Sequence, residues 1–327
     1  MSLTLIKQLK KVNYNMKNMK IFIVTYKRND VLNETLERLF YKTDFPQIPN
    51  TEVNIINNHS GFHMEERFED KVNVIHNNTR PDWSTGNLAK NWNEALLFGF
   101  KDLNNPDAKI VVTMHNDIVL NENWATNLIK MHQKYTFITG QLGDNIISYR
   151  PEAVKKIGMW DERFITPANK EADYYIRALV FNKEKSLIND KSHGRLLNNH
   201  DALELDTSEY RGGDHEWREN VKRSPITREG WYHTSQIFYW KWKDTWKEQP
   251  SYYGWLTQWT KDFVNNPPSP PKVPSFVQYY YFEKDIELHN KNYVGWRKGD
   301  FWIDANKCCD VDIHPYKDGE KFRNLQT

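Results

Sequence analysis

The stretch KIVVTMHND, residues 109–117, sets a run of apolar and β-branched residues directly before a polar triplet. Such a run is typical of a strand that is buried on both faces of a parallel sheet. His115, Asn116 and Asp117 would then stand at the carboxyl end of that strand, where open α/β sheets bind ligands. Asp117 by itself fits either a ligand of Mg²⁺ or Mn²⁺ or an ordinary turn aspartate. The stretch therefore predicts a sheet with a ligand-binding edge.

Three similar runs precede it: KIFIVTY at 20–26, EVNIIN at 52–57 and KVNVIH at 71–76. Segments with apolar residues at helical spacing lie between and after them, at 31–40, 83–100 and 124–135. This alternation predicts an α/β fold with a mainly parallel central sheet flanked by helices. The polar residues at 27–28 and 57–59 would join those at 115–117 along one crevice.

The character of the sequence changes at about residue 206, where charged stretches alternate with Trp and Tyr, and a proline-rich segment occupies 267–274. We expect an N-terminal extension over 1–19, the α/β domain over 20–250 and an aromatic-rich, helical C-terminal extension over 251–327. The aromatic residues of this last part suit either packing against the domain or stacking on sugar rings. The sequence leaves both uses open.

Composition narrows the class of protein. The chain has 327 residues and a formal net charge of +2, without the basic excess of a dedicated nucleic-acid binder. Residues 1–18 carry four lysines but no long apolar run, so we expect no signal peptide or transmembrane helix there. They suit either a leader or a short basic segment that touches a membrane surface. Cys308 and Cys309 are adjacent, which favours a reducing, cytoplasmic location.

Residues 109–124, KIVVTMHNDIVLNENW, resemble the metal-binding segment of family 2 glycosyltransferases, above all its rhamnosyltransferase-like branch. In that branch an apolar strand runs into Asn-Asn-Asp, an apolar pair and a Trp-containing helix. The resemblance implies the GT-A fold, a nucleotide-diphosphate-sugar donor and Mn²⁺ or Mg²⁺ held by Asp117. His115 would ligate the metal or touch the ribose, beside Asn116. The first acidic residue of the common motif is absent here.

Two further segments resemble the family's nucleotide site. KIFIVTYKR, 20–28, is similar to its first strand and base-binding turn, which implies that Thr25, Tyr26 and Arg28 approach the nucleotide. Residues 57–60 stand where the family has Asp-Asn-x-Ser, with Asn57 in place of the base-binding aspartate and Asn58 beside it. An amide offers both a donor and an acceptor, so the resemblance leaves the identity of the base open.

TGNLAKNWNEA, 85–95, resembles the family's helix start that contacts the nucleotide-sugar. This implies donor contacts by Asn87 and Asn91. Arg80 or Lys90 would meet the phosphates, although either also suits a solvated surface cation.

The acceptor side is marked by WDERF, 160–164, and EADYYIR, 171–177, which are similar to the family's "fDe.F" and "(E/D)D.D...R" segments. Alignment on Arg177 puts Glu171 at the catalytic-base position, with Asp173 to bind the acceptor or orient the site. An inverting transfer needs a base because the attacking hydroxyl loses its proton. We expect Glu171 to do this without a large pKa shift. Without the resemblance, Glu171 would be an ordinary helix N-terminal acid.

Two later segments complete the resemblance, which covers roughly residues 20–250. His200, in NNHD at 198–201, stands where the family often completes its metal shell, and a solvated loop histidine is the alternative. FYWKW, 238–242, resembles an aromatic segment on the acceptor side.

Together these segments predict a metal-dependent, inverting glycosyltransferase, a hexosyl- or deoxyhexosyltransferase acting on a glycan, lipid-linked or protein-linked acceptor in polysaccharide or glycoprotein biosynthesis. A degenerate nucleotide-sugar or glycan-binding protein is the main alternative, because the first motif acid is missing. A sugar nucleotidyltransferase is disfavoured, since the turn at 26–30 lacks glycine. A dehydrogenase is disfavoured by the absence of G-x-G-x-x-G.

Overall fold

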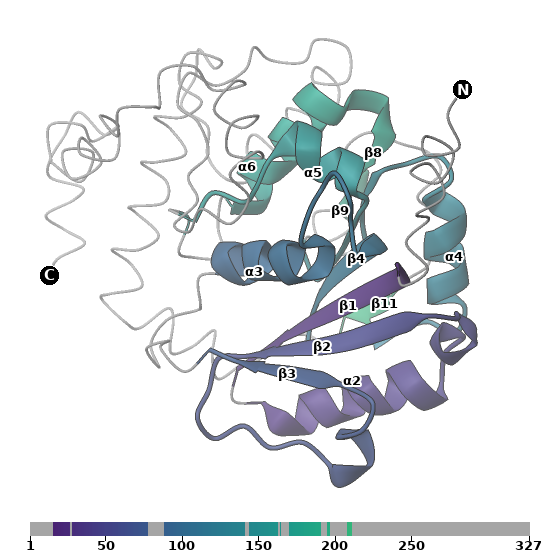
Figure 1. Ribbon diagram of the computed structural model, residues 1–327, viewed down its shortest axis with the longest axis vertical. Coiled ribbons are helices and arrows are strands. Elements are labelled where there is room, and N and C mark those ends of the chain that lie inside the picture. Colours follow the sequence, from purple (N-terminus) through teal and green to yellow (C-terminus); the bar gives the residue numbers. More distant parts are fainter. Residues whose placement is uncertain are drawn as a thin grey trace, which may run out of the picture.

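The computed structural model describes residues 16–26, 28–77, 88–140, 144–162, 164, 170–190, 195–196 and 208–210. Their centre is a seven-stranded sheet in the order β3-β2-β1-β4-β7-β6-β8; Figure 1 shows β3, β2, β1 and β4 of this sheet side by side. The strands are β1 Lys17–Thr25, β2 Thr51–Asn57, β3 Asn73–His76, β4 Ala108–His115, β6 Phe137–Thr139, β7 Ile146–Tyr149 and β8 Ser186–Leu187.

The sheet is parallel except at one strand. β1 pairs in parallel with β2 and β4, β2 with β3, and β6 with β8, whereas β7 runs antiparallel to both β4 and β6. The predicted α/β fold with a mainly parallel sheet is therefore confirmed. The predicted first strand begins three residues early, at Lys17. The start of β7, unlike its end, lies beside the carboxyl end of β4, which matters for the site.

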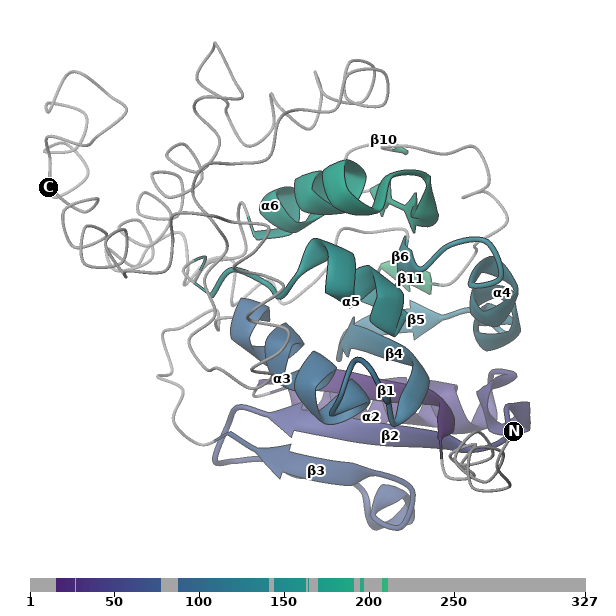
Figure 2. The same ribbon diagram turned by 45° about the horizontal axis from the view of Figure 1, so that its top comes forward.

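Helices cover both faces of the sheet (Figures 1 and 2). They are α2 Asn29–Tyr41, α3 Leu88–Phe100, α4 Trp124–Met131, α5 Pro151–Ile157 and α6 Lys170–Arg177, with a π-helical segment over Ala178–Asn182 and 3₁₀ turns at Phe45–Gln47, Glu66–Phe68 and Lys183–Lys185. Short two-stranded pairings join β5 Ile118–Leu120 to β11 Ser208–Tyr210, and β9 Asn189–Asp190 to β10 Arg195–Leu196.

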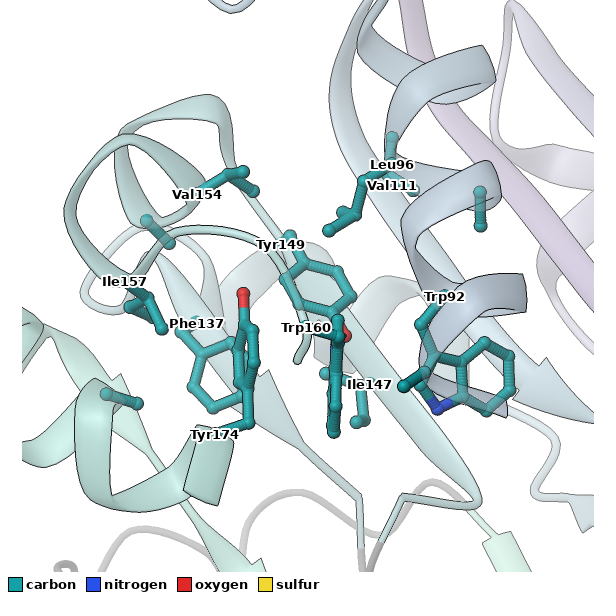
Figure 3. Close-up of a cluster of buried hydrophobic side chains, with 14 of the residues drawn as sticks. Trp92, Leu96, Val111, Phe137, Ile147, Tyr149, Val154, Ile157, Trp160 and Tyr174 are labelled. Carbon is teal, nitrogen blue, oxygen red and sulfur yellow. The ribbon is translucent and has the colours of Figure 1, made fainter. Parts of the chain in front are cut away.

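Alternation along β1 explains the two layers, because successive strand residues point to opposite faces. Ile21 and Ile23 pack in one apolar core with residues of α2 and α4, and Phe22 and Val24 pack in the other with residues of α3, α5 and α6. In the second core the rings of Trp160 and Tyr174 stack, with centroids 4.1 Å apart (Figure 3). This core holds α6, and with it the predicted base, against the sheet.

α3 packs unusually close to β4. A methyl group on Gly99 would lie 2.4 Å from Cγ2 of Val111, nearer than side-chain contacts allow. Glycine at this point therefore allows the short distance between α3 and β4. This distance also sets the position of Trp92, on α3, relative to the end of β4.

Several sequence predictions fall outside the residues that the structure describes. These are the segments 1–15, 238–242 and 251–327, together with the adjacent cysteines, so the predicted domain boundary at 250 stays a prediction. Within the described ranges, no helix has both the length and the apolar composition to cross a bilayer.

Candidate functional site

The carboxyl ends of β1, β2 and β4 lie side by side. In the strand register Thr25 is opposite Asn57, and Val24 is opposite His115. The three polar clusters predicted from the sequence therefore meet at one edge of the sheet. Parallel strands produce this arrangement because their carboxyl ends all emerge on the same side.

The turn after β1 is held by the loop after β4. The Asn116 side-chain amide donates to Oγ1 of Thr25 at 3.0 Å and to the carbonyl of Arg28 at 3.4 Å. The backbone N–H of Asn58 donates to the carbonyl of Thr25 at 3.1 Å. These hydrogen bonds bring Thr25, Asn58 and Asn116 together.

Arg28 and Tyr26 lie at the outer side of this turn. Arg28 binds Asp30 through two hydrogen bonds of 3.0 and 2.9 Å, which hold the pKa of Asp30 below its usual value. The ring of Tyr26 meets that of His59 edge to face, with centroids 5.6 Å apart. The Arg28 side chain is still 42 % exposed, so a phosphate can reach it.

Asn57 uses its amide within its own turn. Its Oδ1 accepts from the His59 N–H at 3.0 Å, and its Nδ2 donates to the His59 carbonyl at 2.7 Å and lies 3.2 Å from Nδ1 of His76. The residue is almost completely buried. The structure thus gives Asn57 a local structural role, and base recognition by this residue stays a prediction.

On α3, Lys90 lies 3.7 Å from Glu94, and both side chains are largely buried. Burial raises the pKa of Glu94, against the opposing effect of Lys90. Asn91, one residue along, is buried. The other predicted donor contacts, Arg80 and Asn87, lie outside the described residues, as does His200.

A chain of polar side chains runs from the predicted metal ligand to the predicted base. Nδ1 of His115 is 3.9 Å from Oδ1 of Asp117, and Nε2 of His115 is 3.6 Å from Oδ1 of Asp144. The Lys170 ammonium lies 2.7 Å from Oδ2 of Asp144 and donates to Oε1 of Glu171. We call these five residues the polar chain.

The reversed direction of β7 brings Asp144 to this place. Thr113 is opposite Ile147 and Met114 is opposite Ile146, and the His115 N–H donates to the carbonyl of Asn145 at 2.9 Å. Asp144, two residues before the start of β7, consequently lies against the end of β4.

Helices contribute the remaining contacts to the polar chain. Nε1 of Trp92, on α3, donates to Oδ2 of Asp144 at 3.0 Å, and its ring lies 5.5 Å from that of His115. Lys170 and Glu171 are the first two residues of α6. Residues far apart in the sequence thus form one buried charge network.

The network contains one ammonium and two carboxylates near it. Burial would raise the pKa of Asp144, but Lys170 and His115 outweigh this effect and hold it well below its usual range. Burial, aided by Asp144, raises the pKa of Glu171 to about 8 although Lys170 opposes the shift. Lys170 itself keeps its charge, because the two carboxylates outweigh its burial and raise its pKa. The expectation that Glu171 needs little pKa change is therefore corrected: Asp144 is the ionised partner of Lys170.

The two predicted catalytic acids occupy different surroundings. Oε1 of Glu171 is held by Lys170, while its Oε2 has no hydrogen-bond partner among the described residues. Asp173 is fully buried and binds Nε of Arg177 at 3.0 Å, and Arg177 also donates to the Ile157 carbonyl at 2.7 Å. Glu171 thus belongs to the polar chain, whereas Asp173 holds Arg177, which ties α6 to α5. Acceptor binding by Asp173 stays a prediction.

Asp117 has a free acceptor that suits a cation. Its Oδ1 is buried and, within the described part of the chain, has no hydrogen-bond partner. Nδ1 of His115 is 3.9 Å from this oxygen, whereas Nε2 of His115 faces Asp144 at 3.6 Å. Carboxylate oxygen and imidazole nitrogen are both ligands that Mn²⁺ accepts. Within these same ranges no cluster of three His, Cys, Asp or Glu residues surrounds a common point. Metal binding by Asp117 therefore stays a prediction.

Sequence reasoning missed Asp144, Lys170 and Trp92. Trp92 fits the apolar face of a helix, and Asp144 precedes a run of only four strand residues. The one available signal was the position of Lys170 directly before Glu171, which no spacing rule marks as functional.

Comparison with known proteins gives weak likenesses. No protein-family model matches the chain, and no curated protein sequence matches it. A mannosyltransferase from Pyrobaculum calidifontis, solved with GDP-Man and Mn²⁺, is 10 % identical with a TM-score of 0.42, over 98 % of this chain and 88 % of that one. TarS from S. aureus is 12 % identical with a TM-score of 0.43, over 92 % of this chain and 50 % of that one.

A third likeness is to a Drosophila galactosyltransferase 7 variant solved with manganese, UDP-Gal and xylobiose. It is 10 % identical with a TM-score of 0.35, over 64 % of this chain and 81 % of that one. Likeness of this degree transfers no residue role or reaction to the chain.

Proposed function

We propose that the chain is a glycosyltransferase of the GT-A fold that uses a nucleotide-diphosphate-sugar donor and inverts the anomeric configuration. The polar chain is the observation that carries this proposal. It holds two acids, Asp117 and Glu171, at one sheet edge, and each keeps one buried oxygen without a hydrogen-bond partner among the described residues. Sugar transfer needs two such groups, one for a metal diphosphate and one for the acceptor proton.

The donor side comprises the ends of β1, β2 and β4. Asp117, with His200 and His115 as further candidates, would hold Mn²⁺ or Mg²⁺. The bound cation would neutralise the diphosphate and act as a Lewis acid on the leaving group. Arg28, exposed beside the turn, and Lys90 would meet the phosphates, while Thr25, Tyr26 and Asn58 would border the nucleoside.

The acceptor side is Glu171. Its Oε2, which has no hydrogen-bond partner among the described residues, would accept the proton of the attacking hydroxyl. The acceptor oxygen then displaces the nucleotide in a single step, which inverts the anomeric centre. Because burial raises the pKa of Glu171 to about 8, the base is active only in its ionised fraction at neutral pH.

The finer assignments rest on the sequence resemblance. We propose a family 2, rhamnosyltransferase-like hexosyl- or deoxyhexosyltransferase acting on a glycan, glycolipid or glycoprotein acceptor in the cytoplasm, with contact to a membrane surface left open. The alternative, a degenerate nucleotide-sugar-binding protein, is favoured by one feature of the sequence, the missing first acidic residue of the common metal-binding motif at 115–117.

Ligand-induced stabilisation tests the donor site. Thermal unfolding would be measured with UDP, GDP, dTDP and CMP, each with and without Mn²⁺, on wild type and Asp117→Ala. A ligand at a hundred times its Kd adds about 2.7 kcal/mol of stability. We expect one diphosphate to give a Mn²⁺-dependent shift that Asp117→Ala loses and the exposed control Asp70→Ala keeps.

Turnover separates the enzyme from the binding protein. With the donor so identified, release of the nucleotide diphosphate would be followed for wild type, Glu171→Gln and the exposed control Glu152→Gln. We expect Glu171→Gln to lower kcat by about 100-fold or more while it keeps donor binding. Equal rates in Glu171→Gln and wild type would remove the assigned base. Donor binding without any turnover would favour the binding protein.

A further inference from the structure

Lys170 is a buried cation that the proposed reaction does not yet use. Its side chain is 1 % exposed, and that of its partner Asp144 is 7 % exposed. Removing an ammonium from water costs several kcal/mol, so it stays buried only where fixed carboxylates compensate the charge. Ion pairing at the protein surface therefore does not explain why Lys170 is buried here.

The contacts of Lys170 join three parts of the fold. Its Nζ binds Oδ2 of Asp144, which precedes β7, and Oε1 of Glu171 on its own helix. Asp144 is in turn fixed by Nε1 of Trp92, on α3, at 3.0 Å. The first turn of α6 is thereby anchored to the end of β4 and to α3 by charge-assisted hydrogen bonds, which are the stronger ones.

We propose that Lys170 is a positioning residue for the reaction proposed above: anchored on Asp144, its ammonium holds one oxygen of Glu171 and leaves the other to take the acceptor proton. The part of the proposal that concerns the acceptor rests on the proposed function. The contact between Lys170 and Glu171 does not, because it is a property of the fold. Without Lys170, the Glu171 carboxyl group would keep neither its orientation nor its counter-charge.

The charges that face Glu171 predict opposite effects for the two partners. Among the residues that the structure describes, they are Lys170 on α6, Asp144 before β7 and, beyond Asp144, His115 on β4. Asp173 and Arg177 form their own pair further along α6. Lys170 lowers the pKa of Glu171 and Asp144 raises it. Removing the cation should therefore make Glu171 harder to ionise, and removing the anion should make it easier.

The pH dependence of kcat tests the proposal with Lys170→Met, Lys170→Arg, Asp144→Asn and the exposed control Lys109→Met. We expect Lys170→Met to lower kcat about 10-fold or more, with little change in KM, and to move the rising limb of the profile to higher pH. Lys170→Arg should restore most of kcat, Asp144→Asn should move the limb to lower pH, and Lys109→Met should match wild type. Limbs unmoved in both Lys170→Met and Asp144→Asn, or equal losses in the Met and Arg variants, would overturn the proposal.

A second readout needs no substrate. Because the folded pKa of Glu171 exceeds the ordinary value of 4.5, the folded state binds more protons than the unfolded state between pH 4.5 and about 8. This residue thus makes stability fall as pH rises through that window. Glu171→Gln should remove this slope, and Lys170→Met should extend it to higher pH.

The two readouts separate the two proposals. If wild type turns over no donor, the proposed function fails, and the unfolding slopes still decide whether Lys170 holds Glu171. If Glu171→Gln abolishes turnover while Lys170→Met equals wild type, the function stands and the role of Lys170 fails. If circular dichroism shows that Lys170→Met does not fold, Asp144→Asn tests the proposal instead. A shift of the rising limb of its kcat–pH profile to lower pH would support the proposal, and no shift would overturn it.

Discussion

Lys170 and Asp144 form a buried ion pair with 2.7 Å between Nζ and Oδ2, although one begins a helix and the other precedes an antiparallel strand. Through Asp144, which lies 3.6 Å from His115, the pair links the first turn of α6 to the end of β4. It thereby holds Glu171, the second residue of α6, near that end of the sheet.

Truncation of Asp144 should be strongly destabilising. Asp144→Ala leaves the Lys170 ammonium without its main counter-charge and Nε1 of Trp92 without an acceptor. Breaking a buried pair in this way costs about 3–5 kcal/mol. Urea unfolding would measure the loss, with the exposed Asp70→Ala, expected to change stability by about 0.5 kcal/mol or less, as the control. A loss for Asp144→Ala as small as the control's would show that the pair is not buried in solution.

Asp173 provides a test of the separation between the two acids of α6. Asp173→Ala leaves the Arg177 guanidinium buried without its carboxylate, which should lower the free energy of unfolding by about 3–5 kcal/mol. Glu171→Gln keeps the shape of its side chain and removes a buried carboxyl group whose ionisation lowers stability, so at pH 8 it should unfold at a urea concentration no lower than that of wild type. The reverse ranking of the two variants would place Asp173 in the crevice and Glu171 in the core.

Gly99 should not tolerate a methyl group. Alanine is the better helix former by about 1 kcal/mol, yet its Cβ would lie 2.4 Å from Cγ2 of Val111. We expect Gly99→Ala to cost about 1–3 kcal/mol by overpacking, measured by urea unfolding. The double variant Gly99→Ala/Val111→Ala should be less destabilised than the sum of its two single changes. A stabilised Gly99→Ala would mean that α3 can move away from β4.

His132 should make the protein sensitive to acid. Burial, with a smaller contribution from Arg150, lowers the pKa of His132 to about 3 despite the hydrogen bond to the Tyr135 carbonyl. The unfolded state, with an ordinary pKa of 6.5, then binds more protons than the folded state, so stability is full above pH 6.5 and is lost as pH falls toward 3. Unfolding midpoints at pH 8 and pH 5 would show a smaller difference in His132→Gln than in wild type. An equal difference in both would mean that His132 is not buried in its neutral form.

The sequence predicts β1, β2 and β4 well because these strands are long and apolar, with segments of helical spacing between and after them. Residue patterns also predict the edge, since each strand passes directly into polar residues such as Asn57 and His115. β7 has only four residues, and a run of that length carries no signal for its reversed direction.

The contacts that join the residues of the polar chain could not be predicted from the sequence for the same reason. Which buried charges pair depends on β7 bringing Asp144 beside β4, and no local propensity encodes that contact. The ionisation of Glu171 then follows from Asp144, a residue distant in sequence. Residue spacing identifies Glu171 as a candidate base, but the pKa of Glu171 depends on contacts that form only in the folded protein.

β4 pairs with β1 on one edge and with β7 on the other, so a single strand sets the alignment of both halves of the site. A slip by one residue exchanges the two faces of a strand, and here it would turn His115 out of the crevice while α3 lost its fit at Gly99. Substitutions in β4 should therefore either leave activity nearly unchanged or abolish it. Libraries that randomise residues 110–114 should divide into variants with nearly full activity and variants with none, whereas changes on the exposed face of α2 should produce a graded series.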